Sequence, residues 1–504
     1  MEATIAADRP AEAPTTAAAP YVDVHETHTG VVVLAGDRAY KAKKPVLTDF
    51  LDFRTPEQRE RACLREVELN SRLSPGSYLG VAHFGDPAGG PAEPIVVMRR
   101  YRDNDRLASM VTRGQPGVEG LLDAIAGVLA RFHAHAERSR LIDEQGKVGA
   151  VGRRWRENLS ELHRYAAGMA ISGVSDELIG RIEHLATEFT SGRELLFTRR
   201  IDEGCIVDGH GDLLADDIFY VDGEPALLDC LEFDDELRYV DCIDDAAFLA
   251  MDLEFLGHKD LGDYFLERYA ALSADSAPPS LRDFYIAYRA VVRAKVDCVR
   301  WSQGKPEAAV DAARHLAIAT QHLQSGAIRL ALVGGNPGTG KSTLARALAE
   351  KVGAEVISTD DVRRELRESG TVTGEPGVLN AGLYSPNNVA TVYEVALRRA
   401  RVCLDNGQSV ILDGTWRDAD MRAHAHSLAA ETHSAVVELV CTATVNAAAD
   451  RIRTRRPGNS DVTPEIATTL AAQHTGWDTA HPMDTSRPLE DSLRAAHDVW
   501  HGTI

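Results

Sequence analysis

The sequence predicts two folded domains of different class. The first is an α+β domain in which a small sheet lobe precedes a mostly helical lobe, and the second is an α/β domain on a parallel sheet. Three observations support this: the 504 residues exceed the roughly 250 to 300 that one core organises, strand patterns give way to helix patterns upstream, and short apolar strands alternate with helices downstream.

The first predicted elements form the sheet lobe. The stretch "GVVVLAGDRAYKAKKPV" predicts two strands around a turn at Gly36-Asp37. "TPEQRERACLREVELNSRL" then predicts a helix with Thr55 as its N-cap, and "PIVVMRRY" predicts a buried strand. The periodic "LLDAIAGVLARFHAHA" begins the helical lobe, which ends with two helices between Leu281 and about Gln324.

A polar break at residues 324–326 marks the predicted domain boundary. Residues 1–20 are rich in Ala, Pro and Thr, which predicts a disordered tail. The first domain then spans 21–325 and the second 326–504. In the second, "RLALVGG", "EVIST", "SVILDGTW" and "AVVELVCTA" predict strands of a parallel sheet with helices on both faces.

The composition limits the class of partner. With 55 basic and 76 acidic residues, the net charge of -21 argues against nucleic acid and anionic membranes as partners. No run approaches the roughly 18 apolar residues of a membrane-spanning helix, and the N-terminus lacks a basic signal-peptide region. Seven scattered cysteines without a C-x-x-C pair predict reduced thiols and a cytoplasmic protein. The oligomeric state stays open.

The stretch "GGNPGTGKST" predicts a nucleotide site of the Walker A type. Gly335, Gly340, Lys341 and Ser342 satisfy the G-x-x-x-x-G-K-S spacing between an apolar strand and a helix. Backbone N–H groups and the helix N-terminus attract phosphate, Lys341 neutralises the terminal phosphates, and Ser342 is a magnesium ligand. We therefore predict that ATP and Mg²⁺ bind here, with these loop residues: Gly335, Asn336, Pro337, Gly338, Thr339, Gly340, Lys341, Ser342 and Thr343.

Two further features accompany this loop. Asp413 closes "SVILDGTW" as a carboxylate of the Walker B type, suited to organising magnesium. Arg451 and Arg455 lie one helical turn apart before a Pro-Gly break, which predicts a lid over the transferring phosphates. A solvated basic helix is the alternative for either arginine.

Over roughly residues 328 to 480, the chain resembles gluconate-kinase-like and polynucleotide-kinase-like P-loop proteins. In "ISTDDVRREL" the resemblance implies that Asp360 is the general base for the attacking hydroxyl and that Arg363 holds the acceptor. Asp361 is the second candidate for the base. A helix N-cap is the structural alternative for Asp360, and both roles can hold together.

The upstream chemistry lies in "DGHGDLLADDIFYVDGEPALLDCLEF". A carboxylate after His-Gly, a hairpin and a second carboxylate at a strand end are typical of a kinase catalytic loop. The stretch resembles the aminoglycoside phosphotransferase and choline-kinase-like group, which implies a bilobal protein-kinase-like fold. On that resemblance Asp212 is the catalytic base and Asp229 a magnesium ligand. Asp217 stands where the group has Asn and still offers oxygen to a hard cation.

Other residues follow from the same resemblance. Lys41 and Lys43 share one strand face, and the resemblance favours Lys43 paired with Glu66 as the phosphate-binding pair, with Lys41 as the alternative. It also implies that Asp241 and Asp245 brace the catalytic loop. Met98 and Arg99 lie where an adenine ring would be read. Apart from the resemblance, the i, i+2 spacing of His133 and His135 points them to different helix faces, which predicts ordinary helix residues rather than metal ligands. The position of His210 in "GHGD" predicts that it organises the loop through hydrogen bonds.

Over most of its length the chain resembles bacterial bifunctional proteins that join an aminoglycoside-phosphotransferase-like part to a P-loop, AAA-type, gluconate-kinase-like ATP-binding part. The resemblance implies an ATP- and magnesium-dependent phosphotransferase with two nucleotide sites. Its acceptor would be a hydroxyl of a small polar metabolite, such as a sugar, an amino sugar or an aminoglycoside-like molecule. Two alternatives stay open: a degenerate kinase-like domain that binds a ligand and regulates a P-loop kinase or ATPase, and a polynucleotide 5'-hydroxyl kinase.

Overall fold

The computed structural model describes residues 22–26, 30–47, 52–85, 89–168, 171–375, 380–454 and 476–504. The predicted tail, residues 1–20, lies outside these ranges. The chain divides into two compact units, the first made of residues 1–109 and 217–234 and the second of residues 110–216 and 235–504. The predicted boundary after residue 325 falls inside the second unit, at the end of helix α11.

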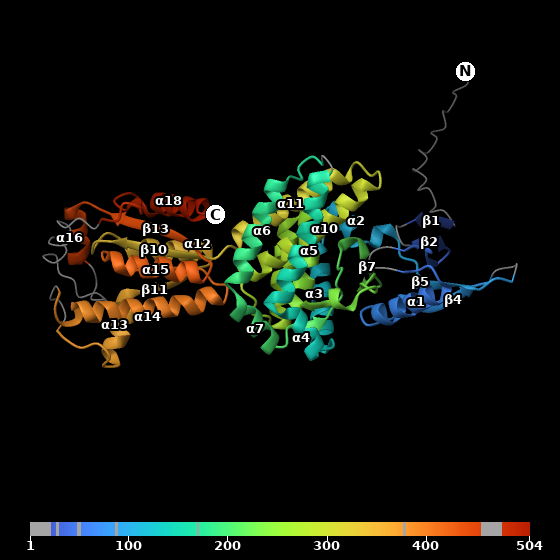
Figure 1. The fold of residues 1–504 in the computed structure, drawn as a ribbon, viewed down its shortest axis with the longest axis horizontal. Helices are drawn as coiled ribbons and strands as arrows, with labels where there is room; N and C mark the ends of the chain where they lie inside the picture. Colours follow the sequence, from blue (N-terminus) through green and yellow to red (C-terminus); the bar gives the residue numbers. More distant parts are fainter. Residues whose placement is uncertain are drawn as a thin grey trace, which may run out of the picture. The chain divides into compact units, whose positions relative to one another are not determined.

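The first unit is built on a five-stranded antiparallel sheet of order β1-β2-β3-β5-β4, drawn in blue in Figure 1. The predicted turn at Gly36 is confirmed, with a φ of 58° that favours glycine. Helix α1 packs against β4 and β5. The strands are β1 (Val22–Glu26), β2 (Gly30–Ala35), β3 (Arg38–Lys43), β4 (Tyr78–Phe84) and β5 (Glu93–Arg99).

Helix α1 (Pro56–Ser71) begins where the sequence predicts, because Thr55 forms a capping box. The Thr55 hydroxyl accepts the Gln58 N–H and the Gln58 side chain accepts the Thr55 N–H. Buried residues recur every three or four positions along one face of α1, at Arg59, Cys63, Glu66 and Asn70. Glu66 therefore projects to the interior of the unit.

The first unit also contains a hairpin of β7 (Ile218–Val221) and β8 (Glu224–Leu227). Ile218 pairs with Leu227, so residues just outside the pair lie at the open end of the hairpin. The Leu228 N–H donates to the Asp217 carbonyl over 3.0 Å, which brings the segments of Asp217 and Asp229 together. The hairpin predicted between these carboxylates is confirmed.

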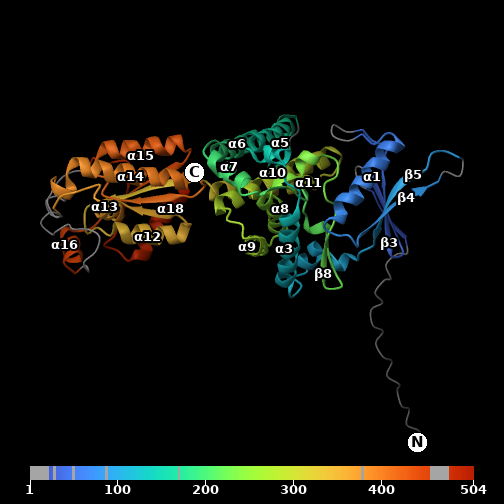
Figure 2. The same ribbon diagram turned by 90° about the horizontal axis from the view of Figure 1, so that it is seen from below.

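The upstream part of the second unit is helical, with a short pair of β6 (Ile206–Asp208) and β9 (Tyr239–Asp241). Figure 2 shows α3, α5, α8 and α10 gathered in this part. A strand-rich first unit and this helical part confirm the predicted α+β class. The helices are α3 (Val118–His135), α4 (Arg140–Gly146), α5 (Val148–Gly168), α6 (Asp176–Ser191), α7 (Glu194–Asp202), α8 (Cys242–Phe255), α9 (Lys259–Ser273), α10 (Pro279–Ser302) and α11 (Ala308–Ser325).

The downstream part of the second unit is α/β, as predicted. Its sheet has the order β11-β12-β10-β13-β14, and every neighbouring pair is parallel. The strands are β10 (Arg329–Gly335), β11 (Glu355–Ser358), β12 (Val410–Asp413), β13 (Ala435–Thr442) and β14 (His481–Asp484). The helices are α12 (Lys341–Val352), α13 (Thr359–Glu368), α14 (Pro386–Asp405), α15 (Ala419–Glu431), α16 (Val445–Thr454) and α18 (Leu489–Gly502).

Helices cover both faces of this parallel sheet (Figure 1). One core contains Val392 of α14 and Leu428 of α15. The other contains Leu344 of α12 and Trp500 of α18. Strands buried on both faces explain the continuous apolar runs in the sequence. Across the described ranges, every helix is too short or too polar to traverse a bilayer.

Candidate active sites

The P-loop runs from the end of β10 to the start of α12, and its backbone is crowded. Gly335, Gly338 and Gly340 have φ values of 131°, 79° and 83°. A Cβ on Gly335 would lie 2.4 Å from the Cys441 carbonyl oxygen, and one on Gly338 would lie 2.5 Å from that of Ala448. Only glycine fits these positions, so the loop is free to turn its N–H groups toward a phosphate.

Around the loop, the predicted magnesium ligands and the lysine come together. The Lys341 ammonium donates to the Asn336 carbonyl over 3.1 Å. Asp413 ends β12 and is buried. Burial raises its pKa above the ordinary value, while Lys341 and the Ser342 hydroxyl act in the opposite direction. A carboxylate and a hydroxyl beside a lysine are oxygen donors of the kind that Mg²⁺ accepts, together with substrate phosphates.

Asp360 lies near the same end of the sheet. Its charge contributes to the raised pKa of Asp413. Ser358 is the N-cap of α13 and Asp360 lies inside the first turn, so the N-cap interpretation of Asp360 is wrong. Arg363 donates to the Asp360 carboxylate, and its guanidinium lies 4.6 Å from the Tyr384 ring centroid. Asp361 instead faces Arg364 at 3.1 Å.

Two arginines reach the P-loop, one of them predicted. Arg451 of α16 donates to the carbonyl oxygens of Thr485 at 2.7 Å and Gly338 at 3.4 Å. Arg417, which the sequence analysis missed, donates from Nη1 to the Asn336 side-chain oxygen over 2.7 Å. The sequence did contain a sign of this position, because Arg417 follows the predicted magnesium ligand Asp413 by four residues. Arg455 lies outside the described residues.

The predicted lysine–glutamate pair of the first unit is present, and both candidate lysines take part. Lys41 Nζ lies 2.9 Å from Glu66 Oε1 and 2.8 Å from Asp229 Oδ1. Lys43 Nζ lies 2.6 Å from Glu66 Oε2 and also contacts Glu232. One buried carboxylate thus holds two lysines, and Lys41 links it to the predicted magnesium ligand.

Both lysines stay charged. Burial alone would lower the pKa of Lys41, but Asp229, Glu66 and Glu232 outweigh it and hold the pKa well above the ordinary value. Lys43 follows the same pattern through Glu66 and Glu232. Burial and Glu66 raise the pKa of Glu232. Sequence analysis did not identify Glu232 as a partner of Lys43, because the one sign of that role in the sequence is its position three residues after Asp229.

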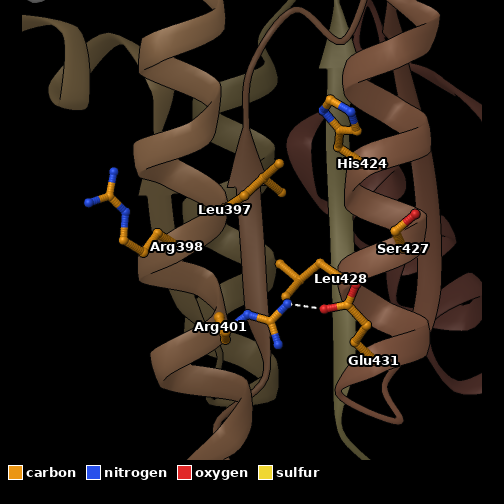
Figure 3. Close-up of a pocket in the computed structure, with 7 residues that line it drawn as sticks. All are labelled: Leu397, Arg398, Arg401, His424, Ser427, Leu428 and Glu431. Atoms are coloured by element: carbon orange, nitrogen blue, oxygen red, sulfur yellow. Dashed lines mark hydrogen bonds and ion pairs between the residues drawn. The ribbon is translucent and has the colours of Figure 1, made fainter.

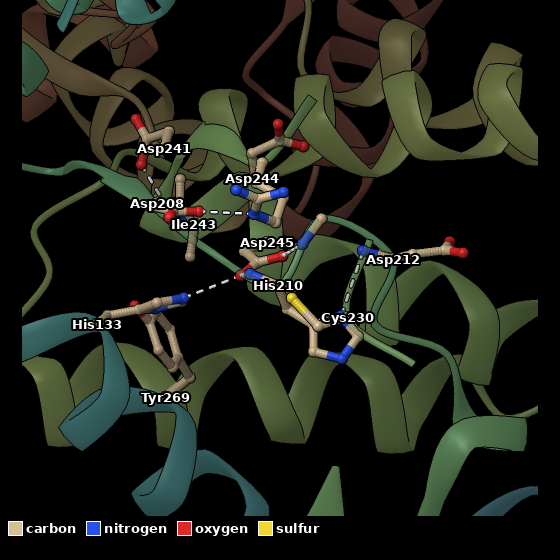
Figure 4. A network of polar contacts seen from close by, with 12 residues as sticks. His133, Asp208, His210, Asp212, Cys230, Asp241, Ile243, Asp244, Asp245 and Tyr269 are labelled. Atoms are coloured by element: carbon tan, nitrogen blue, oxygen red, sulfur yellow. Dashed lines mark hydrogen bonds and ion pairs between the residues drawn. The ribbon is translucent and has the colours of Figure 1, made fainter. Parts of the chain in front are cut away.

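The predicted catalytic loop in the second unit is braced by buried side chains (Figure 4). Asp245 accepts the backbone N–H of His210 at 2.7 Å and of Gly211 at 2.9 Å, as the brace role requires. Burial opposes the charge of Asp245, but hydrogen bonds, first that of His133, hold its pKa well below the ordinary value. His133 also bonds Tyr269 at 2.7 Å, so its two ring nitrogens serve the fold.

Asp212 itself is half-buried. Its N–H donates to His210 Nδ1 over 3.3 Å, while its carboxylate points away from this network in Figure 4. On the other side, Arg289 donates to the Gly211 carbonyl at 3.0 Å and to Asp244 at 2.7 Å. The backbone next to Asp212 is therefore hydrogen-bonded on two sides, which fixes the position from which the Asp212 side chain extends.

Asp241, the other predicted brace, acts at the start of α8. Its side chain accepts the Ile243 N–H at 3.0 Å and so caps the helix. It also receives two hydrogen bonds from the buried Arg200, at 2.9 and 2.6 Å. The pair holds α8 and α7 together behind the loop.

A separate surface pocket of 280 Å³ lies between α14 and α15 (Figure 3). It contains none of the predicted site residues; its lining is Leu397, Arg398, Arg401, His424, Ser427, Leu428 and Glu431. Among the residues that the structure describes, no group of three or more His, Cys, Asp or Glu side chains is arranged to hold a metal ion by itself. Mg²⁺ bound through one or two carboxylates and substrate phosphates needs no such group.

Known proteins resemble separate parts of the chain. A family model described as an AAA domain matches residues 330–475. A choline/ethanolamine kinase family protein from Mesorhizobium loti has 13% identity and a TM-score of 0.37, covering 61% of this chain and 92% of its own. A gluconokinase from Sinorhizobium meliloti 1021 has 17% identity and a TM-score of 0.25, covering 35% of this chain and 91% of its own.

Relatives along the whole chain come from mycobacteria. "Uncharacterized protein Rv2004c" of Mycobacterium tuberculosis (strain ATCC 25618 / H37Rv) is 70% identical over 485 residues, which are 96% of each chain. "Uncharacterized protein Mb2027c" of Mycobacterium bovis matches to the same extent. Because this identity spans both the kinase-like and the P-loop parts, the chain belongs to the family of these mycobacterial proteins.

Proposed function

We propose that the chain is an ATP- and magnesium-dependent phosphotransferase with two nucleotide sites. Each transfers the γ-phosphoryl group of ATP to a hydroxyl of a small polar metabolite. One observation supports this above the others: Asp413 is buried among the charges of Lys341 and Asp360 and the hydroxyl of Ser342. A phosphate-binding lysine, two metal-binding oxygens and a candidate base at one sheet end are the parts that phosphoryl transfer needs.

In the P-loop site, the chain's own residues have distinct tasks. Lys341 exchanges the Asn336 carbonyl for the terminal phosphates. Asp360 accepts the proton of the acceptor hydroxyl while that oxygen attacks the γ-phosphorus and ADP leaves, and Arg363, which donates to the Asp360 carboxylate, holds the acceptor. Bound magnesium, held by Ser342 and Asp413, would supply charge neutralisation of the phosphates.

In the second unit, Asp212 is the proposed base for the second acceptor. In the first unit, Lys41 and Lys43 are proposed to neutralise nucleotide phosphates, and Glu66 holds both lysines in position. Asp229 and Asp217 offer carboxylates to magnesium. The acidic total favours polar or cationic acceptors over polyanions, so nucleic acid and membranes are not proposed as partners.

The test is phosphorylation of a metabolite library by the full chain with MgATP, read by mass spectrometry. Asp212→Asn and Lys341→Ala are assayed singly and together. We expect each single variant to lose a different product and the double variant to lose both. If Asp212→Asn keeps every product, the upstream part is no transferase, and a regulatory role takes its place. A 5'-hydroxyl oligonucleotide in the library tests the polynucleotide kinase alternative.

A further inference from the structure

Helix α18 carries two histidines whose ring nitrogens face each other, outside both candidate active sites. His497 and His501 lie four residues apart, about one helical turn, so their side chains project from the same face of the helix. Their Nε2 atoms are 3.1 Å apart and their ring centroids 4.4 Å apart. At this distance one nitrogen donates to the other, so at least one of the two Nε2 atoms presents its lone pair.

The helical turn that carries the pair is fixed to the P-loop part. Trp500 is 3% exposed and packs in the same core as Leu344 of α12. The buried Arg329 donates from Nε to the Trp500 carbonyl over 2.9 Å, and its guanidinium lies 5.6 Å from the Trp500 ring centroid. Thr503 donates to the Val499 carbonyl over 2.8 Å. The backbone positions of both histidines are therefore set before any ligand binds.

The distance between the two nitrogens fits a shared metal ion. Metal–nitrogen bonds of about 2.0 to 2.1 Å place two nitrogen ligands roughly 2.9 Å apart in an octahedral arrangement and roughly 3.3 Å apart in a tetrahedral one. The observed 3.1 Å lies between these values. His497 is half-buried and His501 is exposed, so an ion reaches the pair from the solvent and keeps water in its other coordination positions.

The charges near the pair determine which ions fit. Desolvation of the ring lowers the pKa of His501 below the ordinary value, and a charge on His497 acts in the same direction. The positive charges of Arg329 and Lys351 add to this, whereas Asp498 opposes it. Positive surroundings disfavour Mg²⁺, which binds through oxygen ligands, most of them negative. An ion of the zinc, nickel or copper type instead gains its affinity from bonds to imidazole nitrogen.

We propose that His497 and His501 chelate one divalent transition-metal ion of the zinc, nickel or copper class at the end of α18. Two histidines at i and i+4 on one helix face are a known way to hold such an ion. The site is separate from the predicted magnesium ligands, which are oxygens. Two protein nitrogens are fewer than the four ligands of a structural zinc site, so the ion is exchangeable and water completes its coordination. The inference does not depend on the proposed phosphotransferase function.

The test is calorimetric titration of Ni²⁺ into the full chain, purified without a histidine tag and freed of metal, with excess Mg²⁺ present to occupy oxygen sites. We expect His497→Gln and His501→Gln each to weaken the tightest Ni²⁺ binding by about tenfold or more, because each removes one of two protein ligands. Saturating Ni²⁺ should raise the melting temperature of the unaltered chain and leave that of both variants unchanged, since the ion binds the folded pair.

His424→Gln on α15 is the matched control. His424 is exposed and lies two residues from His426, so the two point to different helix faces, and His426 bonds Glu438 at 2.8 Å. This variant should bind Ni²⁺ like the unaltered chain. Equal melting temperatures without Ni²⁺ exclude unfolding as the cause of a loss. Unchanged affinity in either α18 variant, an equal loss in the control, or no binding tighter than about 1 mM in the unaltered chain overturns the inference.

Discussion

Glu66 is a single buried carboxylate that forms ion pairs with two lysines. Its carboxylate is 0% exposed and lies within ion-pair distance of both Lys41 and Lys43. Two carboxylates, Asp229 and Glu232, hold the outer sides of these lysines. Buried charges of this kind cost free energy to desolvate and are tolerated only when they are paired.

We expect Glu66→Gln to lower the free energy of unfolding by about 3 to 5 kcal/mol, because the two lysines lose the buried charge between them. Glu68→Gln on the same helix, where the Glu68 side chain is 68% exposed and pairs with Arg65, should cost less than about 1 kcal/mol. Urea unfolding of both variants measures the difference. Equal costs would mean that Glu66 contributes packing and no special charge interaction.

At the scale of elements, helix α11 is joined to two other helices by His322. Its Nδ1 bonds Asp283 of α10 at 2.6 Å and its Nε2 bonds Glu254 of α8 at 2.8 Å. Burial alone would lower the pKa of His322, but the two carboxylates raise it to about 9. Lys259 also lies near both carboxylates. The imidazolium is therefore part of the folded structure at neutral pH.

This raised pKa predicts a specific dependence of stability on pH. The folded value lies above that of the unfolded chain, about 6.5, so the contribution is complete below pH 6.5 and is lost as pH rises through about 9. Relative to His322→Gln, the unaltered chain should lose about 3 kcal/mol of unfolding free energy across that window. Denaturation at several pH values measures it, with the exposed His135→Gln as control. A flat difference would refute the assignment.

At the scale of the whole molecule, the second unit joins its helical and P-loop parts through buried polar contacts. Arg193, at 0% exposure, donates to the Thr432 carbonyl over 2.6 Å. Gly192 leaves no room for a side chain, since a Cβ would lie 2.3 Å from the same oxygen. Ser280 donates to the Gly407 carbonyl over 2.6 Å. Both carbonyls lie at the ends of P-loop-part helices, where they need donors.

We expect Arg193→Met to destabilise the second unit by about 1 to 3 kcal/mol, because it leaves the Thr432 carbonyl buried without this donor. Calorimetric melting should show the P-loop part separating from the helical part as two transitions. Arg181→Met, at an exposed contact with the Ile504 carbonyl, is the control and should melt like the unaltered chain. A single unchanged transition in Arg193→Met would contradict the prediction.

Local patterns in the sequence determined the elements that hold the site. The capping box at Thr55, the turn at Gly36 and the P-loop between β10 and α12 all depend on residues that are neighbours in the chain. The sequence does not predict strands β4 and β14, because Gly80 interrupts the largely exposed β4, and β14 contains a proline and has Met483 as its one buried residue. Patterns of this kind are weak evidence for a strand.

Tertiary structure alone decided which side chains meet. The alternation of a strand places Lys41 and Lys43 on the same face, so the sequence cannot tell which lysine meets which carboxylate. The contacts depend on where folding brings three acidic residues from other segments, Glu66, Asp229 and Glu232. The same holds for Arg417, which reaches Asn336 across 81 positions of sequence. Residue type and spacing specify helices, turns and a phosphate loop because these are local, whereas ion pairs between distant segments exist only once the chain has folded.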